Sequence, residues 1–331
     1  MQSFGPSGFS PETQVADPLD PQIRQFVSAL AEAWAQYPEV ESLPVAEKRR
    51  IAEIVRTPWR QGGPVMTETR DISLATRHGA VRARLHRPTG GDAALPVLIY
   101  LHGGGWTMFS LDTHDRIMRE LAARSGATVI GIDYSLSPEA KFPRALEEIV
   151  DAIRALHGQA HALGIDPERF AIGGDSAGAN LSVTTSLVLR NAGTGPALRG
   201  MLLIYGCFVD EISPEARSGF GAEGNLLTAA EMATFWHNYL ANPAEVFDPL
   251  VSPLRADLAG LPPAFVIGAQ CDVLAEQSRA FEAKLSRAGV DVQFTEYAGA
   301  THSFLEAVSI AEVAERAIAD GAAWLRESFQ Q

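Results

Sequence analysis

The stretch Ile172-Gly173-Gly174-Asp175-Ser176-Ala177-Gly178-Ala179-Asn180 follows a short apolar run and precedes a helical one. It contains the pattern Gly-x-Ser-x-Gly, and the order strand, tight turn, helix is the context in which this pattern presents a nucleophilic serine. A side chain at Gly174 or Gly178 would collide with the neighbouring strand or helix. Ser176 would stand at the amino end of a helix, where N–H groups stabilise a developing negative charge. Because the pattern is also common by chance, its interpretation depends on partners elsewhere in the chain.

Length and composition allow one large domain with an elaboration, or two domains. The chain has 331 residues, of which 46% are hydrophobic, and this is enough for a sizeable core. Its 27 Lys and Arg against 40 Asp and Glu give a formal net charge of −13. Since phosphate binding needs a basic face, this charge argues against nucleic acid as a partner and indicates a solvated acidic surface.

Targeting, membrane and metal signals are missing from the sequence. The first residues show no basic segment followed by an apolar run, and no apolar stretch approaches the roughly 20 residues of a membrane span. We therefore expect a cytoplasmic protein without a membrane span. Two cysteines, Cys207 and Cys271, suggest neither a metal site nor a disulfide framework, so we expect no metal and no cofactor.

Hydrophobic periodicity predicts an α/β fold. Alternating runs over residues 67–76 and 80–87 predict a hairpin around His78-Gly79. From there strands alternate with helices, which implies a mostly parallel sheet with helices on both faces and an antiparallel edge. The later strands are expected at residues 97–101, 127–134, 170–173, 201–205, 264–269 and 292–297, which makes eight in all. Helices are expected at residues 113–124, 142–163, 177–190 and 305–329.

Two segments do not belong to this alternation. Residues 1–19 are rich in Pro, Gly and Ser and are expected to cross the surface loosely, and helices are then predicted from Asp20-Pro21 and over residues 45–55. About sixty residues between 205 and 264 include a capping box from Thr228 to Glu231. We expect these segments to form a cap over the carboxyl end of the sheet. The predicted division is cap helices in 1–60, core in 61–205, cap insertion in 206–250 and core in 251–331.

A glycine run follows the strand predicted at residues 97–101. In His102-Gly103-Gly104-Gly105-Trp106 the backbone N–H groups are unobstructed, which suits anion binding. A phosphate loop would need a following Gly-Lys-Ser/Thr, and a dinucleotide site would need G-x-G-x-x-G; neither is present. With Ser176 downstream, the run predicts an oxyanion hole with donors Gly104, Gly105 and Ala177, and Gly103 as a further candidate. His102 is expected to orient the loop, and a chance tight turn is the alternative.

The serine requires a base, and His302 lies in a loop just after the last predicted strand. This is where the chain order Ser, Asp or Glu, His places the base of a hydrolase. A lone loop histidine is otherwise a surface residue. The other histidines fit less well because they fall in the hairpin turn (His78), on an early strand (His86), in the glycine run (His102) or on helices (His114, His157, His161 and His237).

The base requires an acid that holds its tautomer and stabilises its charged form. Asp272 follows the strand predicted at residues 264–269, at the correct end of the correct strand. Glu276 is the nearest rival, but it is expected to begin a helix and to favour the helix amino end. Asp175 is expected to point away from the site and to have a structural or electrostatic role.

Together these motifs resemble the hormone-sensitive-lipase family of α/β-hydrolases, and most closely its bacterial acetyl-esterase and short-chain carboxylesterase branch. The shared motifs are His-Gly-Gly-Gly-Trp at 102–106, Leu-Asp-Thr-His-Asp at 111–115, Asp-Tyr-Ser-Leu-Ser-Pro-Glu-Ala-Lys-Phe-Pro at 133–143, Gly-Asp-Ser-Ala-Gly at 174–178, Asp-x-Leu at 272–274 and His-x-Phe at 302–304. The resemblance runs from about residue 96 to the C-terminus. This chain departs from the family at Val273, where Pro is usual, and at Ser303, where Gly is usual.

The resemblance implies an α/β-hydrolase fold and two-step hydrolysis of a small-molecule ester through an acyl-enzyme intermediate. Six aromatic side chains are candidates for a pocket under the cap, with the cap core as the alternative for each: Trp106, Phe208, Phe220, Phe235, Trp236 and Phe304. A closed aromatic cap would favour short acyl groups, from acetyl to hexanoyl. The rivals are a non-catalytic small-molecule receptor on the same fold and a hydrolase of lactones or amides. The family also implies a homodimer through the last strand and the C-terminal helix.

Overall fold

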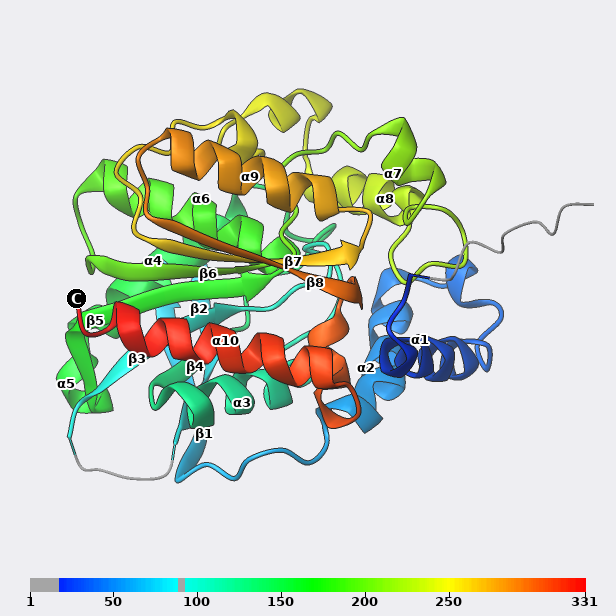
Figure 1. The fold of residues 1–331 in the computed structure, drawn as a ribbon. Helices are drawn as coiled ribbons and strands as arrows, with labels where there is room; N and C mark the ends of the chain where they lie inside the picture. Colours follow the sequence, from blue (N-terminus) through cyan, green and yellow to red (C-terminus); the bar gives the residue numbers. More distant parts are fainter. Residues whose placement is uncertain (1–17, 89–92) are drawn as a thin grey trace, which may run out of the picture.

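The computed structural model describes residues 18–88 and 93–331 (Figure 1). The loose surface segment predicted for residues 1–19 lies outside the described residues except for its last two. The described residues include no helix that is long and apolar enough to span a membrane. Within them, no three His, Cys, Asp or Glu side chains are arranged to hold a metal ion.

The centre of the molecule is an eight-stranded sheet in the order β1-β2-β4-β3-β5-β6-β7-β8. The strands are β1 (Glu68–Thr76), β2 (Gly79–Arg87), β3 (Leu95–Leu101), β4 (Thr128–Ile132), β5 (Ile165–Asp175), β6 (Leu198–Ile204), β7 (Ala264–Cys271) and β8 (Val292–Thr301). β2 pairs antiparallel with β1 and β4, and every other pairing is parallel. The predicted α/β class, strand number and antiparallel edge are confirmed.

Helices cover both faces of the sheet (Figure 1). They are α1 (Pro21–Trp34), α2 (Val45–Arg60), α3 (Asp115–Ser125), α4 (Arg144–Gly158), α5 (Ala160–Leu163), α6 (Ala177–Ala192), α7 (Pro214–Ser218), α8 (Ala229–Tyr239), α9 (Ala275–Arg287) and α10 (Glu312–Ser328). Short 3₁₀ helices are η1 (Val40–Ser42), η2 (Pro243–Phe247), η3 (Pro253–Arg255) and η4 (Phe304–Ser309). Because α4, α6 and α9 cover one face and α3 and α10 the other, the central strands are buried on both sides and are apolar over most of their length, except for the polar starts of β5 and β6.

The helix predicted over residues 305–329 is wrong in one respect, because it is divided into η4 and α10. Ala311 between them is extended, with φ −115° and ψ 118°, and the N–H of Glu312 at the start of α10 is capped by the Gln22 side chain. The segment over residues 142–163, predicted to be mainly helical, contains the two helices α4 and α5. Apolar spacing continues across both breaks, so the pattern alone does not reveal them.

The N-terminal helices lie beside the carboxyl ends of β7 and β8 (Figure 1). α1 begins as predicted, with the Asp20 carboxylate accepting the N–H groups of Gln22 and Ile23. Its buried stripe, which includes Phe26 and Leu30, shares a hydrophobic cluster with η4 and α10. In the insertion, α8 has the predicted capping box at Thr228. The division into core and cap at residues 60, 205 and 250 stays a prediction.

Candidate active site

The turn between β5 and α6 places Ser176 at the carboxyl edge of the sheet. Ser176 has φ 53° and ψ −116°, a conformation that non-glycine residues seldom adopt. The turn lies directly on the end of β3, because a Cβ on Gly174 would lie 2.1 Å from the carbonyl oxygen of Leu101 and one on Gly178 would lie 1.9 Å from it. The two glycines are therefore required by the close approach of backbone to backbone, as their spacing predicts.

Three polar side chains from three strand ends meet at this turn. Asp272 follows the last residue of β7, and His302 follows the last residue of β8. His302 Nε2 lies 3.0 Å from Ser176 Oγ, and His302 Nδ1 lies 2.8 Å from Asp272 Oδ2. Since the strands are parallel, their carboxyl ends meet at one edge of the sheet, and this brings together residues up to 126 positions apart.

The surroundings of Asp272 and His302 hold both groups in place. The side chains of Ser176, Asp272 and His302 are all buried. The second carboxylate oxygen of Asp272 accepts the N–H of Leu274 at 3.0 Å. Glu276, the rival acid, is exposed in the first turn of α9. Ser303, where the family usually has Gly, has φ 59°, in the left-handed region that glycine adopts without strain.

The glycine run lies beside the turn that carries Ser176. Gly104 and Gly105 have φ angles of 109° and 56°. In the described chain, no hydrogen bond uses the N–H of either residue, and Ala177, as the first residue of α6, has no intrahelical partner for its N–H. These three N–H groups are available to an anion beside Ser176 Oγ.

Gly103 does not fit its predicted part as a further donor. Its N–H already donates to Asp175 Oδ1 at 3.0 Å. A Cβ on Gly103 would lie 2.4 Å from Asp175 Oδ2, so the glycine is required by this contact and not by an anion. Gly103 therefore holds the loop in place.

Residues 98–306 match a protein family that is described as having the alpha/beta hydrolase fold. The chain belongs to the α/β-hydrolase family. Solved structures of esterases are similar over most of its length, which confirms the resemblance to the hormone-sensitive-lipase branch.

Three of these structures show the extent of the similarity. A hyperthermophilic esterase from the archaeon Pyrobaculum calidifontis is 34% identical, with a TM-score of 0.87 over 94% of this chain and 99% of that one. The thermostable carboxylesterase EstE1 from a metagenomic library is 34% identical, with a TM-score of 0.83 over 88% and 99%. A thermostable esterase from Pseudomonas putida is 29% identical, with a TM-score of 0.86 over 98% and 100%.

A buried charge lies behind the serine of this α/β-hydrolase. Besides Gly103, Asp175 accepts the Tyr100 hydroxyl at 2.7 Å and His114 Nε2–H at 3.3 Å. Although burial opposes the charged forms, the attraction between the two groups holds the pKa of Asp175 below its ordinary value and raises that of His114. The predicted structural and electrostatic role of Asp175 fits these contacts, but the position of His114 was not anticipated.

His102 has the surroundings of an orienting residue. Its ring stacks on Tyr134 at 4.5 Å between centroids, and its Nδ1–H donates to the Gly103 carbonyl at 2.8 Å. Burial, together with the charge of His114, lowers the pKa of His102 to about 4. A neutral ring in this position holds the loop and transfers no proton near neutral pH.

The six aromatic candidates divide into core residues and two half-buried ones. Trp106 stacks on Tyr239 with centroids 4.3 Å apart and lies 4.6 Å from Trp236, and Phe208 stacks on Phe281 at 3.9 Å. The buried members are Trp106, Phe208, Trp236 and Phe304, and their contacts fit the alternative role as core residues. Phe220 and Phe235 are half-buried. A Cβ on Gly105 would lie 2.2 Å from Phe235 Cγ, so Phe235 contacts the glycine loop at Gly105.

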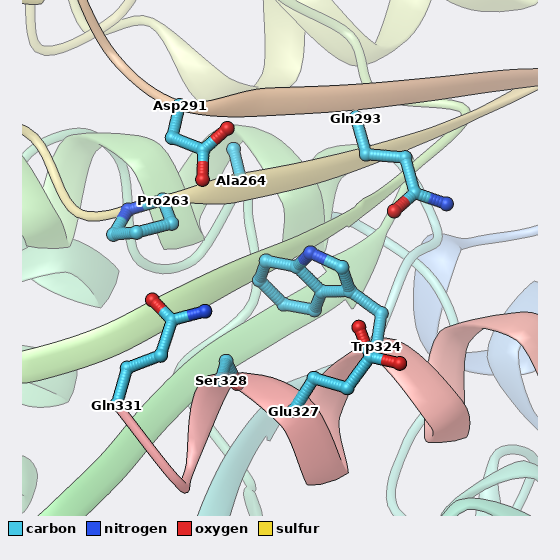
Figure 2. A pocket seen from close by; sticks show the side chains of 8 residues that line it. All are labelled: Pro263, Ala264, Asp291, Gln293, Trp324, Glu327, Ser328 and Gln331. Carbon is cyan, nitrogen blue, oxygen red and sulfur yellow. The ribbon is translucent and has the colours of Figure 1, made fainter.

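A hollow on another side of the molecule is separate from this site. Figure 2 shows that it lies between α10 and the first residues of β7 and β8, with Ala264, Gln293 and Trp324 among its lining residues. Asp272 and His302 follow the last residues of the same two strands. The hollow is therefore at the opposite end of the sheet from Ser176.

Proposed function

We propose that this protein is a serine carboxylesterase that hydrolyses short-chain acyl esters through an acyl-enzyme intermediate. The observation that carries the proposal is the pair of contacts made by His302, 3.0 Å to Ser176 Oγ and 2.8 Å to Asp272 Oδ2. Family membership and esterase neighbours at 28–34% identity support the ester hydrolase class. A receptor on this fold would not need a histidine in contact with the serine.

In the first step Ser176 Oγ attacks the ester carbonyl carbon while its proton passes to His302 Nε2. The carbonyl oxygen becomes an oxyanion, which accepts the N–H groups of Gly104, Gly105 and Ala177. Asp272 accepts His302 Nδ1–H, and its charge stabilises the imidazolium. The tetrahedral intermediate collapses when the leaving alcohol takes the proton from Nε2, and Ser176 keeps the acyl group.

In the second step water takes the place of the alcohol. His302 Nε2 accepts a proton from the water as its oxygen attacks the acyl carbon. The same three N–H groups bind the second oxyanion, and its collapse returns the proton to Ser176 Oγ and releases the carboxylic acid. Apart from the ester and the water, all groups in this proposed cycle come from the chain itself.

The proposed preference for short acyl groups, from acetyl to hexanoyl, rests on the aromatic side chains around the loop. Phe235 lies against Gly105, and Trp106 at the end of the loop is buried and packed with Trp236 and Tyr239. We expect acyl groups longer than hexanoyl to fit only if these rings are displaced. Because well-packed aromatic side chains bury large areas, displacing them costs free energy.

Hydrolysis of p-nitrophenyl esters from acetate to palmitate tests the proposal. We expect kcat/KM to be highest between acetate and hexanoate and to fall for longer chains. Ser176→Ala should reduce kcat by about 10⁶-fold, as in other serine hydrolases, and His302→Ala should cause a loss of similar size. Ser286→Ala, an exposed serine on α9, is the matched control and should leave kcat unchanged.

The outcomes separate the proposal from its rivals. Highest activity on dodecanoyl or longer esters would contradict the short-chain preference and leave the esterase proposal in place. Faster turnover of a lactone or a p-nitroanilide than of any p-nitrophenyl ester would favour lactones or amides as the substrate class. No turnover of any ester, with tight binding of a small molecule, would favour the receptor.

The homodimer is also a proposal. β8 lies at one edge of the sheet, and within the described residues its outer side pairs with no strand. A second copy could pair there in solution, beside α10. Light scattering after gel filtration would give the mass, and a monomer at micromolar concentration would contradict the dimer.

A further inference from the structure

One face of the N-terminal helix α2 lies on the glycine loop. Arg49, Glu53 and Arg56 are spaced i, i+4, i+7, so their side chains share one side of the helix. Each of them contacts the segment that joins β3 to α3, more than fifty residues further along the chain. Their contacts connect the cap to the oxyanion donors.

Arg49 holds two neighbouring loops at once. Its Nε–H donates to the Thr107 carbonyl at 2.7 Å, and a terminal N–H donates to the Ser137 carbonyl at 2.7 Å. Its guanidinium also pairs with the Glu139 carboxylate at 2.8 Å. One turn further along α2, the Glu53 carboxylate accepts the Ser110 hydroxyl at 2.5 Å.

The contact with Thr107 reaches the Gly105 N–H through two peptide planes, those that join Thr107 to Met108 and Gly104 to Gly105. The N–H groups of Thr107 and Met108 both donate to the Gly104 carbonyl, at 3.0 and 2.8 Å. The Gly104 carbonyl and the Gly105 N–H belong to the same planar peptide and point in opposite directions. The turn that Arg49 holds at Thr107 therefore sets the direction in which the Gly105 N–H points.

Arg56 contacts both sides of the site. Its guanidinium lies 4.9 Å from the ring centroid of Phe109, and a Cβ on Gly104 would lie 2.8 Å from that ring. Its Nε also forms an ion pair with Glu306 at 3.0 Å, in which each side chain is only 6% exposed. Glu306 is four residues after His302, so Arg56 joins the glycine loop to the segment that carries the proposed base.

We propose that α2 is a positioning element for the oxyanion hole, with Arg49 and Arg56 as its positioning residues. Neither residue touches the reacting atoms. They set the directions of the Gly104 and Gly105 N–H groups and their place relative to His302. This inference rests on the proposed function, since it concerns the donors of that mechanism.

Arg49→Ala tests the proposal directly, because its side chain is 23% exposed and its loss leaves no buried charge. With p-nitrophenyl acetate we expect kcat to fall by about tenfold to a hundredfold, as for a small misplacement of catalytic groups, and KM to change by less than about threefold. Arg49→Lys keeps one donor for Thr107 and should recover part of the loss. Arg50→Ala, on the neighbouring exposed residue, is the matched control and should match the parent protein.

Inhibition by a trifluoromethyl ketone separates positioning from a general loss of structure. This compound forms a tetrahedral oxyanion on the serine, so its Ki should rise by about the factor by which kcat/KM falls. Titration of the serine with a fluorophosphonate counts intact sites, so kcat is expressed per site. Arg56→Met should show the same pattern.

Two results would overturn the inference. The first is a kcat per site for Arg49→Ala within twofold of the parent. The second is a lower kcat with an unchanged Ki for the ketone. If Ser176→Ala retains ester hydrolysis, the proposed function itself is wrong, and this outcome is distinct from both.

Discussion

The carboxylate of Asp175 accepts the backbone N–H of Gly103 at 3.0 Å, and this bond joins the residue before the serine to the first glycine of the glycine loop. The proposed nucleophile Ser176 and the proposed oxyanion donors Gly104 and Gly105 follow the ends of two neighbouring strands, β5 and β3. Because the bond is buried and charge-assisted, it fixes the distance between them. His114 keeps Asp175 ionised by holding its pKa low.

Two substitutions of Asp175 separate its charge from this hydrogen bond. Asp175→Asn removes the charge and keeps an acceptor for Gly103, whereas Asp175→Ala removes both. We expect kcat to fall by about tenfold in the first variant and by at least another tenfold in the second. Loss of one partner of a buried ion pair should also lower the free energy of unfolding by about 3 kcal/mol in each. Equal kcat values in the two variants would contradict a role for the Gly103 bond.

Gly105 and Phe235 provide a paired test of the loop. In Gly105→Ala the new methyl group would overlap the Phe235 ring, since the two atoms would lie 2.2 Å apart. We expect kcat on p-nitrophenyl acetate to fall by about a hundredfold, the loss caused by removing one oxyanion donor. The left-handed φ of 56° adds about 1 kcal/mol of strain.

Phe235→Ala in the same chain removes the atoms with which the methyl group collides. The double variant should therefore recover at least tenfold in kcat over Gly105→Ala alone, which a double-mutant cycle measures as a coupling energy. Strictly additive effects would show that the two residues do not contact each other in the working enzyme.

The strands and the site residues on their ends could be predicted from the sequence for a physical reason. A strand buried on both faces is apolar throughout, so residues 97–101 and 264–269 were located to within two residues at each end. The ends of strands that carry polar residues could not be located in this way. β5 starts at Ile165 and not at Phe170, because its first residues include charged side chains. Parallel strands end at one edge, so Asp272 and His302 could be placed beside Ser176 before the structure was known.

Contacts between distant segments could not be predicted. Nothing in a run of three glycines shows that the N–H of Gly103 is already bonded, because its acceptor Asp175 is 72 residues away. Arg49 and Arg50 are adjacent residues of the same type, so the sequence does not distinguish them. Only the structure shows that Arg49 faces the loop and that Arg50 is exposed. Trp106 and Phe208 could be recognised as large apolar side chains, but whether they line a pocket or a core depends on packing.

Asp272→Asn tests the proposed acid. The amide cannot hold His302 in the tautomer that accepts a proton at Nε2, so we expect kcat to fall by about 10⁴-fold with little change in KM. Glu276→Gln is the matched control, because this carboxylate is exposed on α9 and should leave kcat unchanged. Steady-state kinetics on p-nitrophenyl butyrate measures both. A large loss of kcat in Glu276→Gln together with full activity in Asp272→Asn would show that Glu276, and not Asp272, is the acid.

His86 on β2 makes the stability of the protein depend on pH. Its side chain is buried, and this burial, with the charges of Arg84 and Arg119, lowers its pKa to about 4 against the opposing attraction of Asp115. Between pH 6.5 and 4 the unfolded chain binds a proton here that the folded protein does not. Stability must therefore fall as the pH falls through this window, and between pH 7 and 5 this group should contribute a loss of about 2 kcal/mol.

Urea unfolding of the parent and of His86→Asn at pH 7 and pH 5 measures this contribution. The parent should lose about 2 kcal/mol more than the variant on acidification, because the variant has no group to titrate at this position. Thr69→Val removes the hydroxyl that lies 3.0 Å from His86 Nδ1 but leaves the ring buried, so this control should keep the pH dependence of the parent. If His86→Asn loses as much stability as the parent on acidification, the acid sensitivity arises from other groups. The pKa of His86 would then be the same in the folded protein as in the unfolded chain.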